Sequence, residues 1–286
     1  MFLLMFFIRL ISKLPFWALY LISDFLYVLM AHVIGYRRKV IIENLQKCFP
    51  EKSAAELDAI SKDFYRNLCD VIVETFKVLD MNVEQMQQRV QTTNLPLLTD
   101  MLDAGTPVLI MTTHQCNWEW LLPGCGTAFS YPTHGAYKPL HNQFFDKVML
   151  SIRSRFGAKL IADTQILRES LRYKDEVRVV ALVADQTPSS PKLAYKTLFL
   201  HRPTAFFTGT ERLAYSLGYP VIFAEMKRVK RGFYEVTYHD IAKPPYDKNS
   251  HQILEGYVRQ TEAAIRRAPS NWLWSHRRWK HHVDLD

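Results

Sequence analysis

The stretch MTTHQCNWEW, residues 111 to 120, places His114 and Glu119 five positions apart beside two tryptophans. A carboxylate bonded to one imidazole nitrogen fixes the tautomer and stabilises the imidazolium, which leaves the other nitrogen free to take a proton from a hydroxyl. His114 with Glu119 as its orienting partner therefore has the residue types of a general base. The alternative is a capped turn that holds a structural histidine.

The flanking elements decide whether these two side chains can meet. On one continuous helix, residues five apart point roughly 140° away from each other. The apolar run PVLIMTT (107 to 113) predicts a buried strand before His114, and Asn117 can cap a helix that follows. A strand-to-helix turn would let the pair meet, with Glu119 near the positive end of the helix dipole.

Other chemistries find less support in the sequence. A metal site needs a third ligand at matching spacing, such as the HExxH pattern, and we expect no metal here. Cys116 is a candidate nucleophile, but its neighbours are better explained as packing. The four cysteines form no CxxC pair or disulfide ladder, which favours a reducing compartment.

The body of the chain predicts an α/β fold. The runs 107–113, 177–184 and 219–225 are continuously apolar, which suits strands buried on both faces, whereas 233–239 alternates and suits an edge. Residues 142–156, 164–173 and 203–217 are typical of helices, the last with Thr204 as a cap and Gly218 at its end. Residues 40–80 are helical apart from a break at Pro50, and Ser53 with Glu56 has the spacing of a capping box.

The first 35 residues are apolar and aromatic, interrupted by Arg9, Lys13, Pro15, Asp24 and His32. Residues 14–35 have the length of a membrane span, or they form a helix that lies in the membrane interface. A buried helix pair of a soluble fold is the remaining alternative. The YRRK cluster at 36–39 favours a body on the cytoplasmic side.

The formal charge of +8 and the pI near 9.2 favour an acidic partner. Lipid headgroups, a phosphorylated substrate, an acidic carrier protein or a nucleic acid would each qualify. None of the basic clusters lies in a nucleic-acid-binding motif, so we do not expect nucleic acid as a partner. WLWSHRRWKHH (272–282) is either a solvated tail or, because it holds three tryptophans, a segment packed on the body or the membrane.

Several stretches, taken together and in order, resemble the bacterial lipid A biosynthesis acyltransferase family, the late lauroyl and myristoyl transferases, which are related to glycerolipid acyltransferases. They are the N-terminal LP…Y segment, YRRKVIIENLQKCFPE, FYRNL…ET, HQCNWE, AYKPLHNQFFD…RSRFGAKLI, VALVADQTP and APSNWLWSHRRWK. The resemblance covers nearly the whole chain. It implies a mixed α/β sheet flanked by helices, like that of the glycerolipid acyltransferases, with an N-terminal membrane helix segment.

The resemblance also implies roles for individual residues. His114 would be the base and Glu119 its partner. Substrate would be positioned by the block with Tyr137, Lys138, Asn142 and Arg153, and by Asp185 and Gln186 at the end of a predicted strand. Lys138 stands where many family members have arginine, and lysine cannot form the bidentate fork. Arg277 and Arg278 are further candidates for binding an anionic substrate, and we interpret His276 as a structural histidine.

The function so implied is acyl transfer from acyl carrier protein to a hydroxyl of a phosphorylated lipid A precursor, without a cofactor, at the cytoplasmic side of the bacterial inner membrane. A lysophospholipid or an aminoacyl lipid is the alternative acceptor. A lipid hydrolase would be expected to carry a GxSxG elbow, which is missing, and a non-enzymatic scaffold would not need His114. We expect a membrane anchor at 1–35, a helical lead-in at 36–105 and an α/β acyltransferase core at 106–286.

Overall fold

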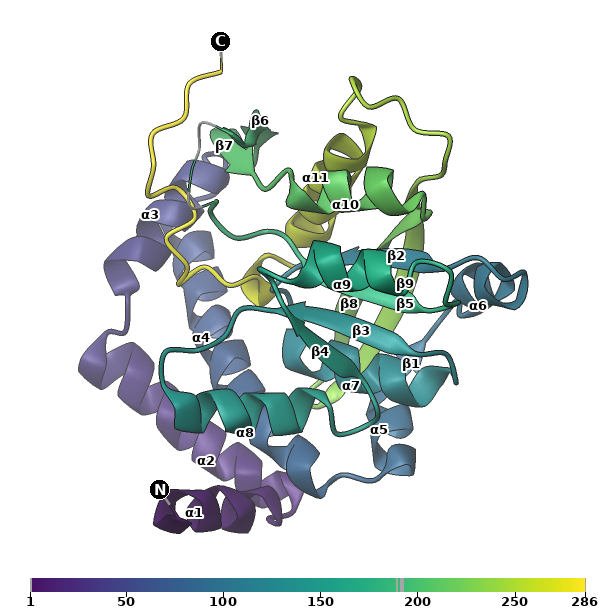
Figure 1. Cartoon of the computed structure of the whole chain (residues 1–286). Coiled ribbons are helices and arrows are strands. Elements are labelled where there is room, and N and C mark those ends of the chain that lie inside the picture. The colour runs from purple at the N-terminus through teal and green to yellow at the C-terminus, as the bar shows by residue number, and fades with distance from the viewer. Residues whose placement is uncertain (1, 189, 191–192, 286) are drawn as a thin grey trace.

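A computed structural model describes residues 2–188, 190 and 193–285 of the chain. Its centre is a seven-stranded sheet in the order β1-β9-β8-β2-β5-β3-β4 (Figure 1). All neighbouring strands are parallel except β8 and β9. The sheet strands are β1 (Val90–Thr92), β2 (Val108–Thr112), β3 (Thr133–Tyr137), β4 (Lys159–Ala162), β5 (Val179–Val183), β8 (Val221–Lys230) and β9 (Phe233–Ala242). The predicted mixed α/β class is confirmed.

The sheet separates two apolar cores, which explains why the central strands are apolar without alternation. All five residues of β2 are buried. Leu109 and Met111 belong to one core, and Val108 and Ile110 to the other. The first core is closed by α3 (Arg38–Cys48), α4 (Ala54–Lys77), α9 (Ile166–Arg172), α10 (Gly209–Leu217) and α11 (Gln252–Arg267), and the second by α5 (Val83–Arg89), α6 (Pro96–Asp103), α7 (Trp118–Ala128) and α8 (Gln143–Arg153).

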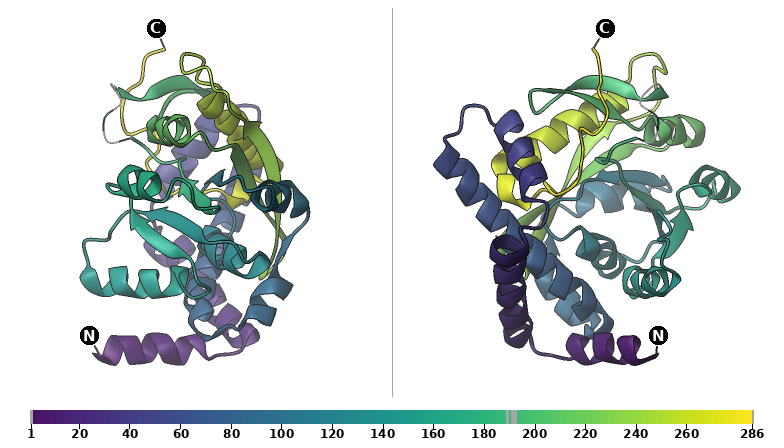
Figure 2. Two further views of the ribbon diagram at one scale, coloured as in Figure 1. Left: turned by 45° about the vertical axis from the view of Figure 1, so that its right-hand side comes forward. Right: turned by 90° about the vertical axis from the view of Figure 1, so that its left-hand side faces the viewer.

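The N-terminal segment is helical and lies on the outside of the body (Figure 2). It consists of α1 (Phe2–Ser12), α2 (Phe16–Val28) and a π-helical continuation, η1 (Leu29–Ile34). The helical stretch Phe16–Ile34 is long and apolar enough to cross a membrane, and only 17% of its most apolar window is buried. The predicted N-terminal apolar helix is therefore present.

The local helix signals are largely confirmed. Ser53 and Glu56 form the predicted reciprocal capping box of α4. Gly218 ends α10 with a φ of 69°, a left-handed conformation that glycine adopts without steric cost. The helices predicted at 142–156 and 164–173 are α8 and α9.

The helix predicted at 203–217 is wrong in its first part. It begins only at Gly209, because residues 202–206 form β7 (Arg202–Phe206), which pairs with β6 (Tyr195–Phe199) in a separate hairpin. Thr204 is not a helix cap; its hydroxyl donates to the carbonyl of Arg202. Pro203, followed by Thr204 and Phe206, suits a strand at the edge of a hairpin better than a helix interior.

The edge position predicted for β9 is also wrong. β1 pairs with the outer side of β9, register Val90 to Tyr234, so that β1 forms that edge of the sheet. A three-residue strand carries too short a pattern to be seen in the sequence. Two short 3-10 helices, Val78–Asp80 and Pro269–Asn271, complete the described elements that bear on the site.

Candidate active site

The predicted strand-to-helix turn carries His114 and is held from several sides. Asn117 is fully buried, and its side-chain oxygen accepts a hydrogen bond from the backbone N–H of Trp120, 3.1 Å away, which caps α7. The C-terminal segment fastens the same turn. The N–H of Leu273 donates to the carbonyl of His114 at 3.1 Å, and the N–H of Cys116 donates to the carbonyl of Asn271 at 2.9 Å. This turn is therefore a fixed platform for the imidazole.

The carboxylate that holds His114 belongs to Asp185, which follows β5 after Ala184. Its Oδ1 lies 2.6 Å from His114 Nδ1, and its Oδ2 accepts from the backbone N–H of His114 at 2.9 Å and from the indole N–H of Trp272 at 2.7 Å. Since an ionised carboxylate can only accept, Nδ1 carries the ring proton. Burial opposes ionisation of Asp185, but the contacts with His114 and Trp272 outweigh it, so the pKa of Asp185 lies below its usual value.

The second ring nitrogen of His114 is consequently the basic one. Nε2 lies 3.2 Å from the amide nitrogen of Gln186, which can donate to its lone pair. The His114 side chain is 20% exposed, whereas that of Asp185 is 2% exposed. The arrangement is a buried carboxylate and an oriented, partly exposed imidazole with one basic nitrogen, which is the geometry of a general base.

The structure corrects the predicted partnership of His114 with Glu119. Glu119 directs both carboxylate oxygens at Arg153, with Nε to Oε2 at 2.8 Å and Nη2 to Oε1 at 2.7 Å. The indole N–H of Trp118 also donates to Glu119, at 3.1 Å. The turn is present, but each side chain has another partner. Arg153 of α8 bonds Glu119, and Asp185, which follows the neighbouring strand β5, bonds His114.

The predicted substrate residues fall into two groups. Tyr137 ends β3, with Lys138 exposed directly after it, and Asp185 and Gln186 follow β5. Since β2, β5 and β3 are adjacent and parallel, these positions and His114 lie at the carboxyl edge of the sheet, where α/β proteins place ligands.

Asn142 and Arg153 are engaged elsewhere, at the two ends of α8. Asn142 caps this helix by accepting from the N–H groups of Phe144 and Phe145 at 3.0 and 3.2 Å. Arg153, in the last turn, forms the bidentate pair with Glu119 described above. Both residues therefore have a structural role at α8.

Comparison with known proteins decides the family. The chain matches the family described as bacterial lipid A biosynthesis acyltransferase over residues 1–281. The chain belongs to this family. It is therefore an acyltransferase.

Three curated relatives of this acyltransferase come from Escherichia coli (strain K12). A lipid A biosynthesis palmitoleoyltransferase is 24% identical over 85% of the chain and 79% of the relative. A lipid A biosynthesis lauroyltransferase is 22% identical over 95% of the chain and 88% of the relative. A lipid A biosynthesis myristoyltransferase is 30% identical over 44% of the chain and 38% of the relative.

The C-terminal segment of the acyltransferase reaches the site through residues that sequence reasoning did not assign to it. Trp272 bonds Asp185, and both Trp272 and Trp274 are buried, so the predicted packing of this segment against the body is confirmed. His276 Nε2 accepts from the backbone N–H of Thr187 at 3.3 Å. Burial lowers the pKa of His276 to about 4, which keeps this ring neutral. The high tryptophan density was the one signal of this contact in the sequence.

Cys116 has the environment of a packed thiol. Its Sγ donates to the carbonyl of Met226 at 3.0 Å, and burial raises the pKa of this thiol to about 12. A protonated, buried thiol is a poor nucleophile, because the thiolate is the reactive form. Among the residues that the structure describes, no group of three or more His, Cys, Asp or Glu side chains could hold a metal ion.

Proposed function

We propose that this enzyme is a membrane-bound O-acyltransferase that moves a fatty acyl chain from acyl carrier protein to a hydroxyl of a lipid A precursor. The family and the names of the relatives, which describe palmitoleoyl, lauroyl and myristoyl transfer in lipid A biosynthesis, support the reaction class and the acceptor. The observation that carries the mechanism is the hydrogen bond from His114 Nδ1 to buried Asp185, which leaves Nε2 as the base.

The proposed reaction has two steps, and the geometry of His114 and Asp185 supports them. Nε2 of His114 takes the proton of the acceptor hydroxyl while the hydroxyl oxygen bonds to the thioester carbonyl carbon, whose oxygen becomes an oxyanion. The oxyanion then re-forms the carbonyl, the carbon–sulfur bond breaks, and the imidazolium returns its proton to the leaving thiolate. Asp185 stays ionised throughout and stabilises the imidazolium.

Gln186 is the nearest donor for the developing charge. Its amide nitrogen lies 3.2 Å from Nε2 of His114. When the acceptor hydroxyl replaces it at Nε2, this amide can donate to the oxyanion, which is the most effective place for a fixed donor. The mechanism requires no enzyme nucleophile and no cofactor.

The exposed end of β3 is the proposed site for substrate phosphate. Lys138 is exposed beside Tyr137 at the same sheet edge as His114. A lysine ammonium attracts phosphate as a point charge. We propose that Asn142 and Arg153 assist mainly by fixing α8, with the Arg153–Glu119 pair joining this helix to α7.

The charge of the chain supports the proposed donor and the proposed location. A net charge of +8 favours an acidic carrier protein as well as an anionic lipid surface. Arg37, Arg38 and Lys39 are exposed directly after the apolar N-terminal helices, and basic residues in this position favour the cytoplasmic side of the inner membrane.

The experiment that tests this function offers the purified enzyme isotope-labelled acyl carrier protein thioesters together with a lipid A precursor, a lysophospholipid or an aminoacyl lipid, and identifies products by mass spectrometry. The proposal predicts an acylated lipid A precursor. Preferred transfer to one of the other two acceptors would contradict the proposal that the acceptor is a lipid A precursor. Transfer only from coenzyme A would contradict the proposal that acyl carrier protein is the donor. Release of free fatty acid alone would indicate a hydrolase.

A further inference from the structure

The N-terminal helices expose an unusually apolar outer face. Among the side chains that the structure describes on α1 and on the α2–η1 helix, ten large apolar ones are between 44% and 71% exposed. They are Leu4, Phe6, Phe7, Leu10, Trp17, Leu21, Phe25, Val28, Val33 and Ile34. A concentration of exposed apolar side chains of this size on a protein marks a contact with a partner or a lipid phase. Exposed Arg9 and Lys13 before α2, and Arg38 and Lys39 after η1, add the positive charge that anionic lipid headgroups attract.

The opposite face of α2 is fastened to α4 along its length. The hydroxyl of Tyr20 donates to Glu74 at 2.9 Å, and that of Ser23 donates to Asp70 at 2.6 Å. Closer to the C-terminal end of α2, the guanidinium of Arg66 lies 4.7 Å from the centre of the Tyr27 ring. The contacts move towards the N-terminal end of α4 as they move towards the C-terminal end of α2, so the two helices run antiparallel side by side.

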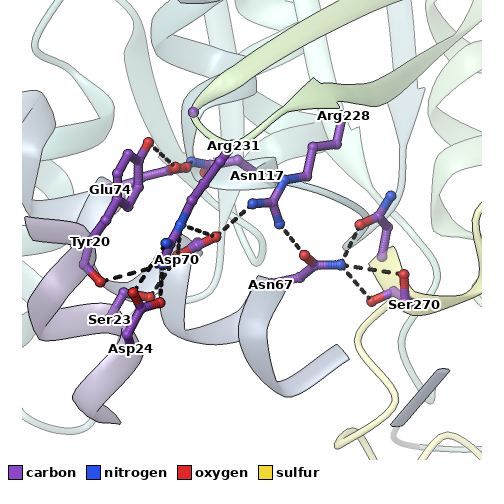
Figure 3. A network of polar contacts seen from close by, with 12 residues as sticks. Tyr20, Ser23, Asp24, Asn67, Asp70, Glu74, Asn117, Arg228, Arg231 and Ser270 are labelled. Atoms are coloured by element: carbon purple, nitrogen blue, oxygen red, sulfur yellow. Dashed lines mark hydrogen bonds and ion pairs between the residues drawn. The ribbon is translucent and has the colours of Figure 1, made fainter. Parts of the chain in front are cut away.

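The hairpin between β8 and β9 adds a second attachment. Arg231 bonds Asp70 at 2.6 Å and also Asp24, on α2, at 2.6 Å (Figure 3). Arg228 bonds the second oxygen of Asp70 at 2.6 Å. Asp24 is thus paired in the middle of the apolar helix, by a cation that belongs to the body of the enzyme.

These attachments are incompatible with α2 crossing a bilayer while it stays on the body. The part of α4 beside Tyr27 exposes Lys62, Asp63 and Arg66 to solvent. If α2 crossed the hydrocarbon core, these charges and the Asp24–Arg231 pair would enter it as well, and charged side chains there are costly. If α2 left the body instead, Glu74 and Asp70 would lose bonds that satisfy two buried carboxylates.

We propose that α2 and η1 lie in the plane of one leaflet, with the outer face in lipid and the inner face on α4, and do not span the membrane. The N-terminus and the catalytic body then lie on the same side. This proposal rests on the membrane location in the proposed function, but it makes no use of the reaction. The occupant of the apolar face is a bilayer surface that contains anionic lipid.

Two exposed lysines that flank the apolar helix provide a matched test. Lys13→Cys and Lys39→Cys can each be labelled with a membrane-impermeant maleimide in intact spheroplasts and in inverted vesicles, because the four native cysteines are buried. Labelling after detergent permeabilisation serves as the reference. In-plane binding predicts that both positions are labelled from one and the same side. Labelling from opposite sides would overturn it, and so would a Lys13→Cys protein that no side labels, because the residue would then lie below the headgroups.

Depth in the membrane is the second readout. Phe25→Trp places a fluorophore near the middle of the helix, and bromine at known positions on the lipid chains quenches it according to depth. In-plane binding predicts stronger quenching from bromine near the headgroups than from bromine near the bilayer centre, relative to the unsubstituted protein. The reverse order would indicate a spanning helix. Either readout can fail while acyl transfer succeeds, so it is separable from the proposed function.

Discussion

At the scale of single residues, the site contrasts two buried carboxylates that the sequence alone does not tell apart. Asp185 uses both oxygens on His114 and Trp272, whereas Glu119 uses both on Arg153 and Trp118. The first carboxylate is therefore positioned to orient His114, the proposed base. The second joins α7 to α8 beside it.

The comparison of Asp185→Asn with Glu119→Gln tests this difference. An amide at 185 cannot hold the proton-donating Nδ1 in the same way, so kcat is expected to fall by about 10²- to 10⁴-fold with little change in KM. Glu119→Gln should lower kcat less, because the basic nitrogen and its carboxylate remain in place. Steady-state kinetics compare the kcat of the two variants, and thermal unfolding checks that both are folded. A larger loss of kcat in Glu119→Gln would contradict the assignment.

His276 makes a prediction about pH. In the unfolded chain this histidine binds a proton below about pH 6.5, whereas in the folded enzyme its pKa is about 4. Between these values the unfolded state binds more protons, so stability is lost as the pH falls from 6.5 towards 4. Thermal unfolding at pH 7 and pH 5 should show this loss, and His276→Gln should reduce it. An unchanged pH dependence in the variant would exclude His276 as its source.

At the scale of elements, the sequence predicted those parts that depend on local pattern. The continuous apolar runs became β2, β5 and β8 because both faces of these strands are buried, and Ser53 with Glu56 capped α4 as their spacing indicated. The partner of His114 escaped prediction because it depends on which strand lies beside β2. That neighbour is β5, 71 residues further along the chain, and no local spacing reports it.

Asn117 links the cap of α7 to the buried carboxylate of Glu74, to which its amide donates at 2.7 Å. Asn117→Ala removes the cap and a hydrogen-bond donor to Glu74, and should lower the free energy of unfolding by about 2 to 4 kcal/mol. Asn117→Asp keeps the cap but places a second carboxylate against Glu74. It should therefore lower the free energy of unfolding more at neutral pH than in mild acid.

A matched control for this experiment is Asn142→Ala. It removes the cap of α8 at an exposed position and should cost only about 1 kcal/mol. Denaturant unfolding of the three variants provides the comparison. Equal effects of Asn117→Ala and Asn142→Ala would mean that the bond to Glu74 contributes nothing.

At the scale of the whole molecule, both ends of the chain close around the sheet. Arg37 donates to the carbonyl of Ser275 at 2.8 Å, and Asn44 donates to that of Trp274 at 3.1 Å. α3 and the residue before it thus help to hold the segment whose Trp272 bonds Asp185. Neither the charge nor the composition of these segments reveals that contact, because it joins residues more than 200 positions apart.

The reactivity of the four buried cysteines provides a test of how tightly the two ends of the chain pack on the sheet. All four are free and buried, and burial raises the pKa of Cys48 and Cys69 to about 12 and that of Cys125 to about 11. A thiol reagent should therefore react slowly with the native enzyme and rapidly with four thiols after denaturation. Fast reaction of one thiol in the native state would reveal local opening, and Cys69, whose Sγ lies 3.8 Å from Met30 Sδ on η1, would report release of the N-terminal helix.

The central claim is that His114 is the general base of acyl transfer. It is tested most directly by the single-turnover rate of His114→Ala on a pre-formed complex with acyl carrier protein thioester and lipid acceptor. The account predicts a rate lower by about 10²- to 10⁴-fold than that of the unsubstituted enzyme, with unchanged thermal unfolding and donor binding. A folded His114→Ala enzyme that transfers the acyl chain at a rate within a few-fold of the original would contradict it.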